Sequence, residues 1–244
     1  MRLADTYVVT EQLLKPLLVR TLEEARDHEE TLARLALDDL PAEADRWSAK
    51  DHVAHLDAWR RHAAEVLNAA GRGEPMSEED ASDIDAQNAR VYAATHDLAA
   101  GDVVASARES YALLISAIHG CTEEQLWQRR VGRPGAIWRV VPGNGHPHVA
   151  GHLTQWFLEH GDGQAADAIA AWSSLLDDLF TDNTSRAAAR YNYACYFAKA
   201  GRVDEALPLL QEAFGIDAGL RSWAAEDSDL SAVRGDPRVA ALLA

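Results

Sequence analysis

The chain has 244 residues, of which 48% are hydrophobic and 25% are charged, and this balance is typical of a soluble globular protein. Its formal net charge of −16 argues against nucleic acid and against an anionic membrane surface as partners, because binding to either draws on basic residues. Since no apolar run is long enough to span a bilayer and the first residues lack the features of a signal peptide, we expect a cytoplasmic protein.

Two long helices are predicted first. Leucines recur at helical spacing over residues 10–38, and Pro41 ends that pattern. Ser48 followed three residues later by Asp51 has the form of a capping box, which predicts a helix that starts there and stops at Gly71 and Gly73.

Three further helices are predicted beyond the acidic segment of residues 73–85. "DAQNARVYAAT" indicates a short helix, and apolar residues share one side of a longer helix over residues 102–119. The best strand candidate is "AIWRVVP" (136–142), which alone makes no sheet. Glycine and proline recur over residues 131–147 and favour an irregular connection. A helix then runs from about Pro147 to Glu159 or His160, and Gly161 and Gly163 are expected to stop it.

The expected fold is all-α, with a four-helix bundle over residues 1–180 and a tetratricopeptide-like C-terminal helical region over residues 181–244. "RYNYACYFAKAGRVDEALPLLQEAFGIDA" follows one tetratricopeptide helix-turn-helix unit, and the tail adds one or two helices. Because a single repeat cannot bury its own apolar face, it must pack on the bundle, on the tail or on a second subunit.

Histidines form the most informative pattern. His148 and His152 stand four residues apart and share one face of a helix, and His55 lies among apolar positions of the second long helix. His55 precedes Trp59 by four residues, as His152 precedes Trp156. Three neutral imidazoles make a facial set that binds Zn²⁺, Ni²⁺ or Fe²⁺ and leaves a position open for water or substrate.

The remaining histidines are weaker candidates. His52 lies one turn before His55, and His146 precedes the pair across Pro147, so either could be confused with a ligand. His62 and His160 suit the surface or a supporting position, and the seven tryptophans suit core and loop anchors. Gln155 is placed to orient an imidazole. His28, His96 and His119 show no partner pattern.

"WSAKDHVAHLDAW", "DAQNARVY" and "HVAGHLTQW" together resemble the DinB-like superfamily of metal-binding four-helix bundles, over about residues 8 to 178. That superfamily includes bacterial thiol transferases and maleylpyruvate-isomerase-type proteins. The resemblance implies a divalent metal bound by His55, His148 and His152, a cleft that Asn88 and Tyr92 line unless they only pack the helix, and a homodimer.

We therefore expect a metal-dependent enzyme that acts on a small molecule, as a thiol S-transferase or a hydrolase, with a low-molecular-weight thiol as one substrate class. We expect Zn²⁺ or Ni²⁺ as the metal before Fe²⁺ or Mn²⁺. The alternative is a non-catalytic protein that binds a protein partner through the tetratricopeptide-like tail, or that sequesters a reactive metabolite in the bundle cleft for self-protection.

Overall fold

The computed structural model describes residues 14–38, 46–74, 84–130 and 135–243. This described part is helical and contains no strand, only an isolated antiparallel bridge between Arg129 and Ala136. The prediction of an all-α chain is confirmed. Among the described helices, none is long and apolar enough to cross a membrane.

The described residues form two compact units, residues 14–153 and residues 154–243, which are called the N-terminal and the C-terminal unit below. The division falls within α7 (His146–Glu159), earlier in the chain than the boundary at residue 180 that the sequence suggested. The first two turns of α7, which carry His148 and His152, therefore belong to the N-terminal unit.

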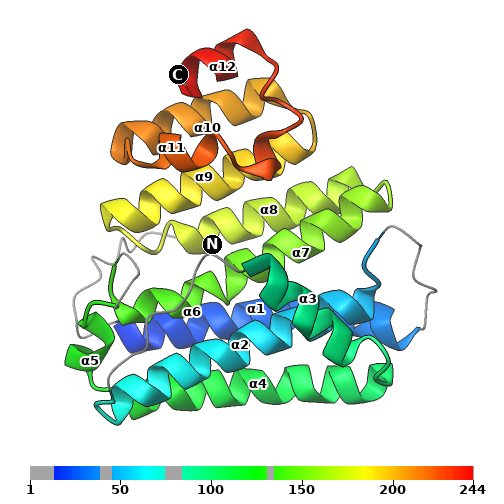
Figure 1. Ribbon diagram of the computed structural model, residues 1–244, viewed down its shortest axis with the longest axis vertical. Coiled ribbons are helices and arrows are strands. Elements are labelled where there is room, and N and C mark those ends of the chain that lie inside the picture. Colours follow the sequence, from blue (N-terminus) through cyan, green and yellow to red (C-terminus); the bar gives the residue numbers. More distant parts are fainter. Residues whose placement is uncertain (1–13, 39–45, 75–83, 131–134, 244) are drawn as a thin grey trace, which may run out of the picture. The chain divides into compact units, whose positions relative to one another are not determined.

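The N-terminal unit is built on three long helices. Before α7, its elements are α1 (Leu14–Leu37), α2 (Ala49–Gly71), α3 (Ile84–Thr95), α4 (Ala100–Gly120), α5 (Glu123–Trp127), the 3₁₀ helix η3 (Ile137–Arg139) and α6 (Val140–Gly143). Helices α1, α2 and α4 pack against one another, and α3 lies against α2 (Figure 1). Their apolar faces form a buried core that includes Leu18, Leu22, Leu32, Leu56, Leu67, Leu114 and Ile118.

The start of α2 is fixed by the predicted capping box. The Ser48 hydroxyl accepts a hydrogen bond from the Asp51 backbone N–H at 3.2 Å, and Asp51 Oδ2 accepts one from the Ser48 backbone N–H at 2.9 Å. These bonds satisfy two backbone donors that the first turn would otherwise leave unpaired. They set the register that buries His52 and His55 on the same helix.

The best strand candidate of the sequence, residues 136–142, does not form a strand. This segment forms η3 and α6. Its β-branched and aromatic residues are buried by helical turns, because no neighbouring strand among the described residues offers a ladder of hydrogen bonds. The described part of the expected irregular connection is therefore mostly helical, and α7 begins at His146 with Pro147 in its first turn, where a proline is tolerated.

The C-terminal unit contains a helix that the sequence did not indicate. Gly161, with φ of +75°, ends the turn after α7, and the Asp162 carboxylate then accepts a hydrogen bond from the Ala165 N–H and caps α8 (Gly163–Asp177). Gly163 was expected to stop a helix, whereas it starts one. The remaining elements are α9 (Asn183–Lys199), α10 (Val203–Ile216), α11 (Leu220–Ala224), the 3₁₀ helix η4 (Ser228–Leu230) and α12 (Pro237–Leu243).

Helices α9 and α10 form an antiparallel hairpin about Gly201, whose φ of +70° suits the turn. The hairpin does not stand alone. Helix α8 packs on α9, and η4, α11 and α12 pack on the hairpin from the tail side. Together they bury a core that includes Ala194, Ala198, Ala206, Leu210, Ala213 and Phe214.

Candidate metal centre

Three histidines from two helices converge in the N-terminal unit. His55 Nε2 on α2 lies 3.0 Å from His148 Nε2 on α7, and His152 Nε2 lies 3.2 Å from the same atom. The ring centroid of His55 is 5.0 Å from that of His148 and 4.7 Å from that of His152. The structure thus brings together the three residues that the sequence singled out, and they could hold a metal ion.

The spacing of these nitrogen atoms fits a shared cation. Ligands of a tetrahedral Zn²⁺ at about 2.0–2.1 Å lie about 3.3 Å from one another, and two of the three pairs are within a few tenths of an ångström of that separation. Because the donors are three imidazoles without a carboxylate, the cation would keep its full charge. His55 is buried, whereas His148 and His152 are partly exposed.

Burial keeps two of these imidazoles neutral. It lowers the pKa of His55 to about 4, and it lowers the pKa of His148 to about 3, with a smaller contribution from the positive charges of His55 and Arg60. Neutral imidazole is the form that ligates a metal. The Nδ1 atoms of His55 and His148 are also buried without a hydrogen-bond partner in the described part of the chain.

An aromatic wall flanks the cluster. Trp47 stacks on His152, with centroids 6.0 Å apart and planes 6° from parallel, and its ring lies 5.1 Å from that of His55. The sequence interpretation took this tryptophan for a core or loop anchor. Its position directly before the cap residue Ser48, on the helix that carries His55, is the signal that would have placed it at the site.

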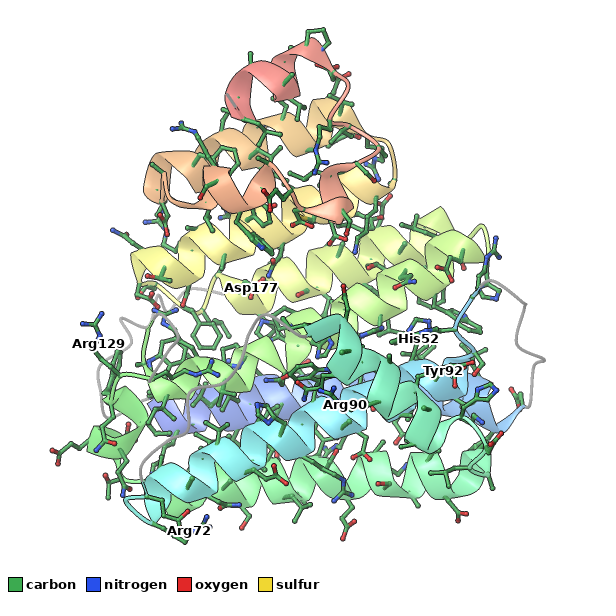
Figure 2. All side chains as sticks on the ribbon, in the orientation of Figure 1. His52, Arg72, Arg90, Tyr92, Arg129 and Asp177 are labelled. Atoms are coloured by element: carbon green, nitrogen blue, oxygen red, sulfur yellow. The ribbon has the colours of Figure 1, made fainter. Side chains whose placement is uncertain are left out.

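The two α3 residues that the resemblance assigned to the cleft reach the cluster through tryptophans. Tyr92 lies 6.5 Å from Trp47 and is 37% exposed, and it lies near His52 at the end where α2 begins (Figure 2). Asn88 Oδ1 accepts a hydrogen bond from Trp59 Nε1 at 3.1 Å, and the Trp59 ring lies 6.2 Å from that of His55. Both residues thus support the aromatic side chains beside the cluster.

Of the weaker candidates, His52 makes a direct contact with a predicted ligand: its Nδ1 lies 2.8 Å from His152 Nδ1. His146 is fully buried as the first residue of α7, not in a loop as expected, and it lies outside the three-histidine group. His62 packs its ring against Trp59. The Gln155 amide, which was expected to orient an imidazole, donates to Glu159.

A second group with metal-ligand chemistry lies in the C-terminal unit, where atoms of Cys195, Asp227 and Asp229 come within 4.8 Å of one another. Its carboxylates are already engaged, since Asp227 accepts a hydrogen bond from the Tyr191 hydroxyl at 2.8 Å and Asp229 pairs with Lys199 at 2.9 Å. Burial raises the pKa of the Cys195 thiol, which disfavours the thiolate that a metal would need. The ligand atoms of this group are thus engaged with other side chains of the protein.

Comparison with known proteins gave no match to this chain among family models, curated proteins or solved structures.

Proposed function

We propose that this protein is a metal-dependent enzyme that acts on a small molecule, with a divalent cation held by His55, His148 and His152. The observation that carries the proposal is the convergence of three Nε2 atoms from α2 and α7 at separations that suit one cation. The resemblance of the histidine and tryptophan motifs to DinB-like proteins supports it, and the arrangement as a DinB-like bundle with a tetratricopeptide-like hairpin belongs to the same proposal.

The donor set favours Zn²⁺ or Ni²⁺. Imidazole suits both ions, and the group found among the described residues offers three imidazole nitrogens and none of the carboxylates that Mg²⁺ or Ca²⁺ requires. A cation in such a site supplies Lewis acidity, which lowers the pKa of a water molecule or a thiol toward neutrality. Transfer of a low-molecular-weight thiol and hydrolysis are the two reactions that follow from this chemistry.

The residues around the cluster determine what reaches it. His148 and His152 are partly exposed, while Trp47 covers one face of His152. The flat faces of Trp47 and Tyr92 are nearly parallel to each other, 18° apart, and suit an apolar or planar portion of a small substrate. These side chains would exclude water from one side of the reacting group and orient it toward the histidines.

Metal content tests the proposal directly. The purified protein, stripped with a chelator and reconstituted with Zn²⁺, is expected to retain about one ion per chain by elemental analysis, as catalytic His₃ sites do. His152→Ala should retain almost none, and His62→Ala, which removes a histidine of α2 from outside the cluster, should match the wild type. Equal metal in wild type and His152→Ala would reject the assignment.

Turnover separates an enzyme from a protein that sequesters a metabolite. The Zn²⁺-loaded wild type, incubated with a low-molecular-weight thiol and a panel of electrophiles, should consume the thiol faster than the chelated protein does. Tight binding without consumption, or hydrolysis in place of thiol transfer, would redirect the proposal to sequestration or to a hydrolase.

One observation favours the non-catalytic alternative. Trp223 on α11 of the C-terminal unit is 59% exposed, and large exposed aromatic side chains are enriched at protein interfaces. A protein whose stability is unaffected by Zn²⁺, which retains no metal and which loses a defined partner on Trp223→Ala, would support that function in place of the enzyme.

A further inference from the structure

His52 lies behind one of the candidate ligands. It is fully buried on α2, one turn before His55, and its Nδ1 is 2.8 Å from His152 Nδ1. The two rings meet edge to face, with centroids 5.0 Å apart and planes at 66°. Since His152 directs its other nitrogen, Nε2, toward the cluster, His52 contacts the far side of that ring and cannot bind the same cation through this nitrogen.

The proton count of an imidazole makes this contact directional. A neutral imidazole carries one proton, so a ring that binds a cation through Nε2 must carry its proton on Nδ1. In His152, that proton points at His52 Nδ1, which is within hydrogen-bond distance. The corresponding Nδ1 atoms of His55 and His148 have no acceptor among the described residues.

We propose that His52 is a positioning residue for the metal centre: its Nδ1 accepts the hydrogen bond of His152 Nδ1–H and thereby fixes the tautomer and the orientation of that ligand. This inference rests on the proposed function, because it assumes a cation at the three-histidine cluster. Partners of this kind raise the basicity of a ligating imidazole and hold its ring in place.

Packing supports the same role. Trp47 stacks flat on His152 and meets the edge of His52 at 5.5 Å, so one side chain restrains both rings. Without a cation, the same contact can run in the opposite direction, with His52 Nδ1–H donating to His152 Nδ1 while His152 Nε2–H donates to His148 Nε2 at 3.2 Å. With a cation bound at Nε2 of His152, the His152 proton would sit on Nδ1, and the His52 proton would have to sit on Nε2 so that His52 Nδ1 can accept.

Two substitutions separate the hydrogen bond from the packing. His52→Leu introduces an apolar side chain of similar size and removes the acceptor. His52→Asn instead carries Oδ1 on Cγ, the atom that carries Nδ1 in histidine, and so restores an acceptor. With Zn²⁺ alone as the probe, in competition with a chromophoric chelator, His52→Leu should bind about 10- to 100-fold more weakly than the wild type. His52→Asn should recover most of the affinity, and His62→Leu should be unchanged.

A spectroscopic measurement reports the bond itself. In the Zn²⁺-loaded wild type, long-range ¹H–¹⁵N NMR should show His152 protonated at Nδ1, with a proton that exchanges slowly with solvent. In His52→Leu this proton should exchange rapidly, and the visible absorption bands of the Co²⁺-substituted protein should shift, while His52→Asn resembles the wild type in both measurements. Circular dichroism of the metal-free variants checks that each is folded.

Several outcomes would overturn the inference. Wild-type Zn²⁺ affinity and an unchanged Co²⁺ spectrum in His52→Leu would leave the metal centre intact and remove the role of His52. Equal weakening in His52→Asn and His52→Leu would show that packing alone matters. A wild-type protein that binds no Zn²⁺ would instead overturn the proposed function, and this inference with it.

Discussion

Two buried polar clusters in the N-terminal unit differ in how many of their polar atoms have a hydrogen-bond or charge partner. The ion-pair cluster consists of Arg60, Glu29, Ser110 and Tyr111. The Arg60 guanidinium donates to both oxygens of Glu29 at 2.5 and 2.8 Å and to the Ser110 hydroxyl at 2.9 Å, and it lies 4.0 Å from the centroid of the Tyr111 ring. In this cluster the positive charge of Arg60 is paired with the negative charge of Glu29, and both groups are hydrogen-bonded.

The three-histidine cluster has no such internal pairing of charges and hydrogen bonds. Its rings direct nitrogen atoms at one another, no carboxylate belongs to the group, and Nδ1 of His55 and of His148 lack partners in the described part of the chain. Buried polar groups normally find partners, and exceptions mark functional sites or an absent ion. The ion-pair cluster is thus paired within the protein, whereas the histidine cluster has the unpaired nitrogen atoms that the proposed cation site requires.

The largest effect is expected from a substitution that breaks the ion-pair cluster. Glu29→Gln leaves the fully buried Arg60 charge without its partner, which should lower the free energy of unfolding by about 3–5 kcal/mol in urea denaturation. The double variant Glu29→Leu/Arg60→Met removes both charges and should lose much less. A loss below about 1 kcal/mol in Glu29→Gln would mean that this pair is not the structural element described above.

The metal-free histidine cluster should make stability depend on pH. The pKa of His55 is 6.5 when unfolded and about 4 when folded, so between these values the unfolded chain binds more protons and stability falls as pH falls. The loss between pH 6.5 and pH 4 should be on the order of 3 kcal/mol, as measured by urea unfolding after chelation. His55→Asn should have a flatter profile in this range. Equal slopes in both proteins would contradict the lowered pKa.

Zinc should stabilise the folded protein, and it should do so only through the histidine cluster. At a free Zn²⁺ concentration of 100 times the dissociation constant, the wild type should gain about 2.7 kcal/mol of unfolding free energy, because only the folded chain assembles the site. Differential scanning calorimetry should show a rise in Tm that His148→Ala abolishes. A similar rise in both proteins would place the zinc elsewhere.

The smallest expected effect concerns the start of α2. Ser48→Ala removes the cap that accepts from the Asp51 N–H, and this should cost about 1 kcal/mol of stability in urea denaturation. Because the cap also sets the register of His52 and His55, zinc affinity should fall slightly. Ser48→Asp, which keeps an acceptor, is the matched control, and a stability loss in that variant equal to that in Ser48→Ala would argue against the capping role.

Local signals explain what the sequence could predict. The box formed by Ser48 and Asp51, and the four-residue spacing of His148 and His152, lie within single helices, so their geometry follows from helical periodicity. The pairing of those histidines with His55 needed a resemblance to known motifs in addition, because it depends on how α2 faces α7.

Long-range packing explains what the sequence did not predict. Arg60 and Glu29 are 31 positions apart on different helices, and no spacing rule connects them. Trp47 reaches His152 only through the tertiary fold. Helix α8 was missed because Gly163 is a common stop signal, although here Asp162 caps a new helix immediately after the turn at Gly161. The β-branched run at residues 136–142 became helical because no described strand lies beside it.

X-ray absorption at the zinc edge, on the protein reconstituted with one Zn²⁺ per chain, tests the central claim most directly. Three imidazole nitrogens at about 2.0–2.1 Å are the predicted result in the wild type, and His152→Ala, which should retain almost no zinc, should lose this spectrum. A spectrum with one imidazole or none in the wild type, or one that His152→Ala leaves unchanged, would contradict the claim that these three histidines hold the ion.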